Sequence, residues 1–478
     1  MLNTRFEPLE RRQLFAATFY VAPDGNDTNT GDAPTAAWRT VQRAFDAATP
    51  GATVLVQPGV YREKLELRVS GNAIDGPIRF IADGALGDVV ISGKRVKGPN
   101  LIHIINQSFV SVEGFELRDN TGVLDGSAIR IEGACEGIDL LNNRIQKMRG
   151  QNAMGITVYG TDAVNGIRDL TIDGNEIFKC QPAPSEALTL NGNVHDFAVT
   201  NNFIHDVNNI GIDFIGGEGI SFDPATDRAR NGVCSGNRVE RARSNYGGGY
   251  AAGIYVDGGR DIVIERNVVT QSDVGIEVGS EHAGLTAENI VVRNNLLTDN
   301  SKAGIGVGGY APEVGRVANS FVLNNTLYHN GRKARGAGGE IWIQLGSGNT
   351  IENNLVVGGG RKPLLLNDEN DPAASPANTV DFNLYFSDVR KAKPVFNFGG
   401  NSYATLADYA AASNRDAVSL FADPLLAGPS RADYRLTAGS PAIDAGNPAF
   451  VVGVDERDLA GTARIVGLRV DLGATEFT

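Results

Sequence analysis

Apolar and polar residues alternate in short segments along most of the chain. Residues 262–265 read Ile-Val-Ile-Glu and residues 276–278 read Ile-Glu-Val, and comparable segments recur at short intervals. Segments of this length are too short for helices, and a period of two residues is typical of strands with one buried face. The pattern therefore predicts an all-β protein built from many short strands.

An asparagine-containing motif, apolar-x-apolar-x-(Asn)-Asn-x-apolar, repeats at a nearly constant step. Its key residues are Asn143, Asn175, Asn202, Asn237, Asn267, Asn295, Asn325, Asn354 and Asn383, with steps of 32, 27, 35, 30, 28, 30, 29 and 29 residues. Such a period indicates a solenoid in which each repeat forms one coil. Asparagine tolerates left-handed backbone angles, so we expect each key residue at a sharp corner, stacked in a hydrogen-bonded ladder. Asn267 and Asn295 should then occupy the same corner of successive coils.

The composition fits this fold and restricts the partners. The 478 residues include 59 glycines and only 7% aromatic residues, which suits many strands joined by tight turns. A net charge of −13 argues against nucleic acid as a partner, because the surface would repel phosphates. No apolar run approaches the roughly 20 residues of a membrane span. Cys135, Cys180 and Cys234 lie too far apart for a metal finger or a disulfide framework, so we expect small buried side chains.

Both flanks of the repeats resemble those of a known superfamily. Residues 19–27 precede a predicted helix over residues 38–44, and residues 50–61 end in Pro-Gly-Val-Tyr. This arrangement resembles the opening of pectate-lyase-like β-helix proteins, in which a helix covers the first coil and shields its core and strand edges. Residues 433–446 and 471–476 resemble the terminal segment of exported bacterial β-helix proteins. The resemblance implies a right-handed parallel β-helix with an N-terminal helical cap and a C-terminal extension.

The first residues contain a short motif of their own. Residues 6–14 read Phe-Glu-Pro-Leu-Glu-Arg-Arg-Gln-Leu, which resembles the segment that opens many exported planctomycete surface proteins. This implies a disordered export leader over residues 1–17 and a secreted or cell-surface protein. We expect the capped β-helix over residues 18–400 and, over residues 401–478, a short helix and a terminal segment that pack on the last coils. The alanine-rich stretch 403–415 predicts that helix, and we expect a monomer.

The resemblance does not identify a reaction. The Asn-Thr-Asp, Asp-Asp and Gly-His-Gly set of polygalacturonases is absent, as is the Trp-x-Asp-His signature of pectate lyases. The superfamily holds lyases, hydrolases, epimerases and non-catalytic proteins, so no set of catalytic residues carries over to this chain.

Strand alternation nevertheless places three acidic side chains on one outward face. Aligning the second strand of successive coils gives one outward column of Thr157, Thr189, Asp213, Tyr255, Glu277 and Gly306, and a second of Tyr159, Asn191, Ile215, Asp257, Gly279 and Gly308. Asp213, Asp257 and Glu277 thus share a solvent face. Strand and residue spacings put the backbones of Asp257 and Glu277 about 8 Å apart, and those of Asp213 and Glu277 about 10 Å apart.

Neighbouring segments complete a candidate groove. Glycine-rich turns at 216–219, 258–259 and 279–282 are predicted to keep it open, and an aromatic insertion at 241–250 is predicted to lie beside it. Tyrosine rings can stack on sugars, and an arginine can hold a carboxylate or sulfate. The predicted substrate-binding residues are Tyr255, Arg243, Tyr246, Tyr250, Glu218, Glu281 and His282.

Three functions fit this acidic face. The one we favour is hydrolysis of a polysaccharide or oligosaccharide without a cofactor, with Asp257 and Glu277 as the acid/base pair and Asp213 tuning a pKa or replacing one partner. The second is a lyase or epimerase acting on uronates, in which Ca²⁺ binds the acids. Because no lysine occupies either column, Arg243, Lys302 or His282 would have to reach in as the base. The third is a non-catalytic glycan-binding surface protein. The scattered histidines offer no zinc-ligand spacing, and only the lyase alternative requires calcium.

Overall fold

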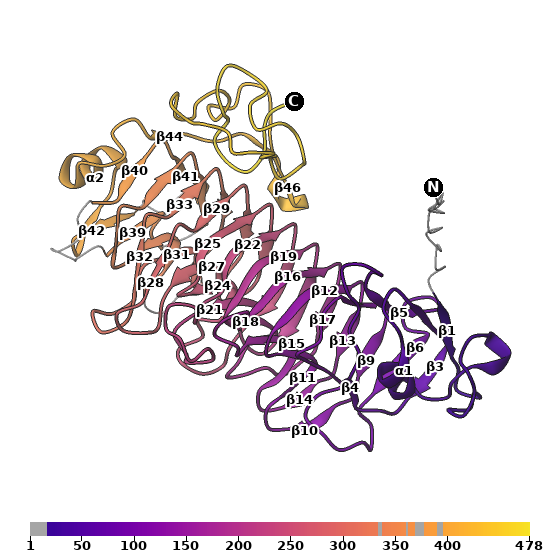
Figure 1. The fold of residues 1–478 in the computed structure, drawn as a ribbon. Coiled ribbons are helices and arrows are strands. Elements are labelled where there is room, and N and C mark those ends of the chain that lie inside the picture. The colour runs from indigo at the N-terminus through magenta and orange to yellow at the C-terminus, as the bar shows by residue number, and fades with distance from the viewer. Residues whose placement is uncertain (1–16, 333–336, 360–361, 369–376, 390–394) are drawn as a thin grey trace, which may run out of the picture.

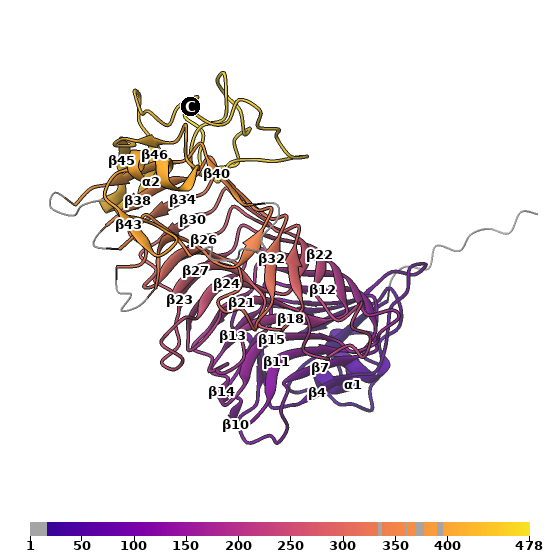
Figure 2. The same ribbon diagram turned by 90° about the vertical axis from the view of Figure 1, so that its left-hand side faces the viewer.

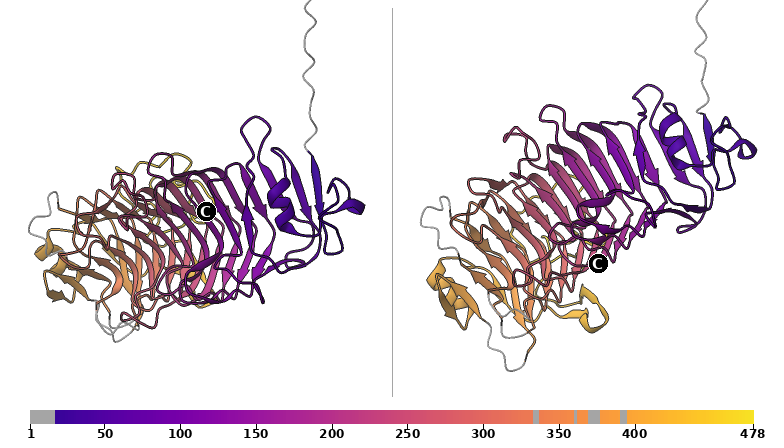
Figure 3. Two further views of the ribbon diagram at one scale, coloured as in Figure 1. Left: turned by 60° about the horizontal axis from the view of Figure 1, so that its bottom comes forward. Right: turned by 90° about the horizontal axis from the view of Figure 1, so that it is seen from below.

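The computed structural model describes residues 17–332, 337–359, 362–368, 377–389 and 395–478, so the predicted leader lies outside the described residues except for Ala17. The chain winds into an elongated stack of coils (Figure 1). Each complete coil contributes one strand to each of three long, almost entirely parallel sheets, called A, B and C in the order in which the chain visits them. Figures 2 and 3 show the same stack from one side and from below.

The strands are short, as the sequence predicts. Sheet A contains β1 (Thr18–Val21), β2 (Thr53–Val56), β5 (Ile78–Ala82), β8 (Val110–Glu113), β12 (Cys135–Leu141), β16 (Ile167–Asp173), β19 (Val194–Thr200), β22 (Arg230–Ser235), β25 (Arg260–Glu265), β29 (Val291–Arg293), β33 (Phe321–Leu323), β37 (Thr350–Glu352) and β40 (Thr379–Asp381), extended by β28 (Thr286–Glu288), β32 (Arg316–Ala318) and β36 (Gly346–Ser347). Sheet B contains β3 (Gly59–Tyr61), β6 (Val89–Ser92), β9 (Glu116–Arg118), β13 (Arg144–Gln146), β17 (Glu176–Phe178), β20 (Phe203–Val207), β23 (Arg238–Ala242), β26 (Val268–Thr270), β30 (Leu296–Thr298), β34 (Thr326–Tyr328), β38 (Leu355–Gly358), β41 (Leu384–Ser387) and β44 (Leu420–Phe421).

Sheet C carries the face with the predicted acids. It contains β4 (Leu65–Leu67), β7 (Ile102–Ile105), β11 (Gly126–Glu132), β15 (Ala153–Gly160), β18 (Leu188–Gly192), β21 (Ile212–Ile215), β24 (Ala252–Asp257), β27 (Val274–Gly279), β31 (Ala303–Val307), β35 (Gly339–Ile343), β39 (Leu365–Asn367), β42 (Phe396–Phe398) and β43 (Asn401–Tyr403). Two small pairs lie outside the three sheets: β10 (Thr121–Val123) with β14 (Arg149–Gly150), and β45 (Leu426–Gly428) with β46 (Asp433–Leu436).

One continuous apolar core runs inside the stack. In sheet C, Ile254, Ile276 and Ile305 pair in register and are fully buried, and the other sheets contribute inward residues in the same way. The three cysteines are free and buried, as predicted. Among the described residues, no helix has the length and apolar character needed to cross a membrane.

The key asparagines form the predicted ladder at the corner between sheets A and B. The backbone N–H and Nδ2 of Asn267 both donate to Oδ1 of Asn295, at 2.9 and 3.0 Å, and the same pair of bonds links each step from Asn143 to Asn383. Asn267 and Asn295 therefore occupy the same corner, as predicted. At the last step Asn383 donates instead to Ser419 Oγ and Asp416 Oδ1.

The predicted backbone role of these asparagines is wrong. The left-handed residue at each corner is the one before the ladder asparagine, for example Asn294 before Asn295 (φ 57°) and Arg266 before Asn267 (φ 54°). The ladder residue itself must turn its side chain inward and along the stack, so the sharp turn falls on its neighbour. Two properties that the sequence analysis assigned to one residue are divided between two.

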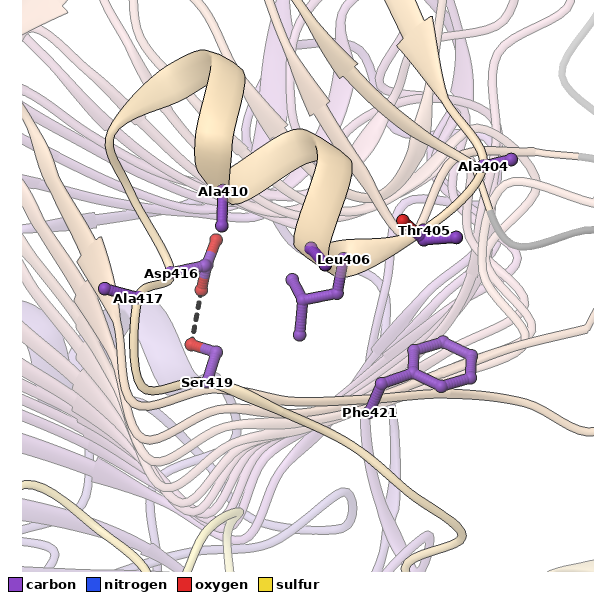
Figure 4. A pocket seen from close by; sticks show the side chains of 9 residues that line it. Ala404, Thr405, Leu406, Ala410, Asp416, Ala417, Ser419 and Phe421 are labelled. Atoms are coloured by element: carbon purple, nitrogen blue, oxygen red, sulfur yellow. Dashed lines mark hydrogen bonds between the residues drawn. The ribbon is translucent and has the colours of Figure 1, made fainter.

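Helices lie at both ends of the stack. At the N-terminal end α1 (Val41–Ala47) buries Val41, Ala44 and Phe45 in the main core. At the other end lies α2 (Leu406–Ser413), which is capped by Thr405, whose side chain accepts from the Asp408 N–H. A mostly apolar cavity beside α2 contains Asp416, which the ladder already uses and which accepts from Ser419 (Figure 4).

The segment from residue 447 to 478, here called the C-terminal strap, reaches back along the corner between sheets A and B. Glu456 accepts from Arg293 and Asn294, Asp471 O accepts from Asn324, and the Asn447 N–H donates to Asn353 Oδ1. The strap therefore contacts three successive coils near the C-terminal end of the stack, more than ninety residues earlier in the chain, along a corner that does not involve sheet C.

Candidate active site

The first predicted column on sheet C is correct, and the second is confirmed from Tyr159 to Ile215 and from Asp257 to Gly279. Thr157, Thr189, Asp213, Tyr255, Glu277 and Gly306 pair residue by residue along β15, β18, β21, β24, β27 and β31. Asp257 pairs with Gly279, two residues beyond Tyr255 and Glu277. Because the flanking residues point into the core, these side chains lie on the outer surface of the sheet.

The prediction that this face is open to solvent is wrong. Asp213, Tyr255 and Asp257 are only 2%, 4% and 5% exposed. Two insertions fold over the sheet and turn the predicted groove into a covered cavity. Their lengths are visible in the sequence, but the direction in which they fold depends on anchoring contacts between distant residues.

The first insertion, residues 243–251, is anchored by Asp273 and covers one side of the face. The Asp273 carboxylate accepts from the N–H groups of Ser244 and Ala251, at 2.9 and 3.3 Å. The Tyr246 hydroxyl reaches across and donates to the Pro184 carbonyl at 3.4 Å. Tyr246 therefore closes part of the cavity mouth.

The second insertion, residues 216–229, is anchored by Asp227, which accepts from the N–H groups of Gly219 and Ser221. It brings Glu218 over the sheet, where the carboxylate accepts from Asn191 Nδ2 at 2.6 Å. The prediction that Gly258 holds a groove open is wrong. A Cβ on Gly258 would lie 2.4 Å from Leu285 Cδ2, so this glycine allows close packing instead.

Under these insertions lies a cavity of about 360 Å³, here called the acidic cavity. Five carboxylic side chains line it, together with the rings of Tyr246, Tyr250 and Tyr255; the acids are Glu186, Asp213, Glu218, Asp257 and Glu281. None of the described residues that line it is a lysine, arginine or histidine. Asp213 Oδ1 is buried without a hydrogen-bond partner, whereas Asp257 Oδ1 accepts from the Glu281 N–H at 2.6 Å.

A second cavity of about 480 Å³, here called the aromatic cavity, adjoins the first. The two share Tyr250, Tyr255 and Glu281 as walls. The aromatic cavity adds Glu277, Tyr310, Trp342 and Gln344. Tyr255 stands between Asp213 and Glu277 in the column, so Glu277 belongs to the aromatic cavity while Asp213 and Asp257 share the acidic one.

Burial and mutual repulsion keep protons on these acids. Burial, together with the nearby charges of Glu218 and Asp257, raises the pKa of Glu186 to about 8. Burial likewise raises the pKa of Asp257 to about 8, although the Glu281 N–H opposes this, and raises that of Glu277 to about 8. The pKa of Asp213 is raised well above its usual value by burial and by the surrounding carboxylates. Protonated carboxylic acids are therefore present at neutral pH.

Two predicted residues do not join the cavities. Arg243 lines a separate hollow with His329 and Asp299, and its Nε donates to the Gln271 carbonyl. His282 packs against Gly217, where a Cβ would lie 3.2 Å from it, and its Nε2 is buried without a partner. The remaining predicted binding residues, Tyr255, Tyr246, Tyr250, Glu218 and Glu281, line the acidic cavity.

Three residues that line the two cavities, Trp342, Gln344 and Glu186, were not among those predicted from the sequence. Trp342 and Gln344 continue the two columns by one coil, since Trp342 pairs with Gly306 on β31. Both residues would have been identified if the strand alignment had been extended by one coil, from Ile305 to Ile341. Glu186 gave no such signal, because it precedes β18 in a turn where alternation no longer fixes the side-chain direction.

The distribution of the carboxylates bears on metal binding. Among the described residues, no group of three or more histidine, cysteine, aspartate or glutamate side chains is arranged to hold a metal ion. The acids surround a cavity rather than converging on one point.

The raised pKa values predict a pH-dependent stability. A carboxyl whose pKa is higher in the folded state than in the unfolded state stabilises the fold fully at pH values below the unfolded pKa, and that stability is lost as the pH rises towards the folded value. Wild-type protein should therefore lose stability between about pH 4 and pH 8. Asp257→Asn should unfold at a higher temperature than wild type at pH 9 but not at pH 5, as measured by circular dichroism. Equal shifts at both pH values would contradict this.

A family model described as "Right handed beta helix region" matches residues 100–314 and 252–387. These matches cover more than half of the chain, which therefore belongs to this family. It is a right-handed parallel β-helix, as the repeats and the flanking motifs predicted, and no subfamily is identified.

The chain is similar to one curated protein over most of its length. It is 34% identical over 441 residues to the uncharacterized protein YwoF of Bacillus subtilis (strain 168), covering 88% of this chain and 91% of YwoF. Among solved structures, XylC in complex with xylose aligns with a TM-score of 0.52 at 12% identity, covering 86% of this chain and 87% of XylC. Pectate lyase Pel9A aligns with a TM-score of 0.48 at 16% identity over 96% of each chain. Identities this low show the fold alone.

Proposed function

We propose that the protein is a carbohydrate-active enzyme that hydrolyses glycosidic bonds in the acidic cavity. The observation that carries this is the pairing of Asp257 with a second carboxyl, Asp213, in one cavity walled by tyrosines. Hydrolysis needs a carboxylic acid to protonate the leaving oxygen and a carboxylate to activate water or attack the sugar. The similarity to a xylose complex is consistent with a sugar ligand.

Asp257 is the best candidate for the general acid. Its pKa of about 8 keeps it protonated at neutral pH, and the Glu281 N–H fixes one of its oxygens. The shared cavity favours Asp213 over Glu277 as its partner, because Tyr255 stands between Asp213 and Glu277. Register places the Asp213 and Asp257 backbones one strand and two residues apart, or about 8 Å.

The decisive experiment is a screen of a glycan panel that records both new reducing ends and absorbance near 235 nm. A hydrolase produces the first signal alone, because water adds across the cleaved bond. Eliminative cleavage of a uronate also leaves an unsaturated product that absorbs. Both signals together would establish the lyase instead, and the absence of both with every glycan would favour a non-catalytic binding protein. We place this activity outside the cell and assign it to a monomer.

Removal of divalent cations provides a separate test. We expect hydrolysis to continue at the same rate after treatment with a chelator, because the carboxyls supply both the proton and the base. Loss of activity with EDTA, reversed by added Ca²⁺, would support the calcium-assisted mechanism. Thermal unfolding recorded with and without EDTA separates a structural ion from a catalytic one.

A further inference from the structure

The acidic cavity has more carboxyls than hydrolysis requires. Two are sufficient for the chemistry, whereas five line this cavity, and none of its described lining residues is a cation. Two basic side chains lie behind its walls without lining it: Lys302 Nζ lies over the Tyr250 ring at 4.5 Å from its centroid, and His282 packs against Gly217 and interacts electrostatically with Glu281. Burial and mutual repulsion keep protons on these acids, and a cationic ligand would allow them to ionise.

The second observation is a set of buried acceptors without donors. Asp213 Oδ1 lines the cavity, belongs to a side chain that is 2% exposed, and has no hydrogen-bond partner. Asn191, which holds Glu218, also leaves its Oδ1 without a donor. An ammonium group offers three donors and no acceptor, so it satisfies such a site better than a hydroxyl does.

From these observations we propose that the acidic cavity binds a sugar residue carrying a free amine, so that the substrate is a cationic glycan. This rests on the proposed function, since it takes the cavity as the place where the sugar is held. A uronate or sulfated sugar would add negative charge to the five acids. A calcium ion needs six to eight oxygens at 2.3–2.6 Å, and the acids lie around a space of about 360 Å³ without converging in that way.

The aromatic cavity then receives the neighbouring sugar. Tyr310 and Trp342 supply ring faces there, and Trp342 is held by a bond from its Nε1 to Asp368 at 3.1 Å. Ring faces bind the apolar side of a pyranose without requiring a charge. The two cavities together accommodate a disaccharide unit, with the amine recognised on one side of Tyr255 only.

Isothermal titration calorimetry tests this directly. The ligands are methyl glycosides of glucosamine, galactosamine and mannosamine, each paired with its N-acetylated form, at pH 6.5 where an amine with a pKa near 7.7–8.0 is mostly charged. We expect at least one free amine to bind about tenfold more tightly than its N-acetyl partner, with affinity that falls as salt is added. Equal or tighter binding of the N-acetylated forms, or no binding by any of the amines, would overturn the proposal.

Release of protons by the cavity carboxyls when the ligand binds provides an independent test. A bound ammonium lowers the pKa of nearby carboxyls, so Glu186 and Asp257, with pKa values of about 8, should release protons. A neutral sugar would only desolvate them and cause proton uptake. Titrations in two buffers with different heats of ionisation distinguish the two, and uptake would argue against a cationic ligand.

Variants locate the site. Asp213→Asn should reduce the advantage of the amine over its N-acetyl partner, while Asp169→Asn, at an exposed left-handed position on sheet A, should leave it unchanged.

Ca²⁺ that binds at micromolar concentration and displaces the amines would instead make the cavity a metal site and overturn the proposal. If neutral glycans are hydrolysed without proton release, the proposed function stands and this inference fails. If amines bind but no glycan is hydrolysed, this inference stands and the proposed function fails.

Discussion

Replacing Asp257 by asparagine is expected to slow hydrolysis by about 10²–10⁴-fold, because the general acid is lost. At neutral pH the native side chain is mostly protonated, so asparagine substitutes one neutral group of the same shape for another. Its Oδ1 can still accept from the Glu281 N–H. At about pH 4 the free energy of unfolding should change by less than about 1 kcal/mol, whereas at neutral pH the variant should be more stable than wild type, because the Asp257 carboxyl ionises only in the unfolded state. Rates on the best substrate of the screen and urea unfolding curves provide the two measurements.

The matched control is Asp169→Asn, which makes the same exchange on sheet A and should leave the rate unchanged. Glu265 is unsuitable as a control despite its place on sheet A, because it is buried and paired with Arg293 at 2.8 Å. Comparing Asp213→Asn with Glu277→Gln then identifies the partner, and we expect the larger loss at Asp213. A wild-type rate in Asp257→Asn would remove Asp257 from the mechanism.

The second large effect is expected from Asn267→Ala, which should lower the free energy of unfolding by at least about 3 kcal/mol. The side chain accepts from the N–H and Nδ2 of Asn237 and donates to Cys234 O and Asn295 Oδ1. Alanine leaves the Asn237 N–H buried without its partner, which costs about 1–3 kcal/mol. It also removes one bond each from Asn237 Nδ2, Cys234 O and Asn295 Oδ1, at about 0.5–1.5 kcal/mol per bond. The midpoint of urea unfolding measures the loss.

Asn201→Gly is the control for this substitution. Asn201 is exposed, has a left-handed backbone (φ 54°), and makes a single side-chain bond to Asp173. Glycine adopts that conformation freely, so the change should be within about 1 kcal/mol. If both variants unfold at the same urea concentration, the ladder contributes little to stability.

The repeat of asparagines was enough to predict the β-helix and its register. A side chain that must fill the same corner in every coil leaves a fixed step in the sequence, and alternation then assigns each strand residue to one face. Asp213, Tyr255, Asp257 and Glu277 were placed correctly for this reason. The same logic, carried one coil further, reaches Trp342.

The burial of the site was beyond such reasoning. Whether Asp213 is exposed depends on where the insertions 216–229 and 243–251 fold, and they are held by Asp227 and Asp273 through bonds to backbone N–H groups. No periodicity links these acids to the loops they anchor. Arg243 was placed near the site because it begins an insertion, but its side chain turns to the other side of the coil.

The C-terminal strap changes how the stack can come apart. In a solenoid each coil contacts only its neighbours, so unfolding can proceed one coil at a time from an end. The strap joins three successive coils through Arg293, Asn324 and Asn353. Unfolding that starts at the C-terminal end must break the strap contacts with all three coils together. The activation barrier to unfolding is therefore higher than it would be for coils released one at a time. The strap is therefore expected to slow unfolding from the C-terminal end, through contacts that do not involve the acidic cavity.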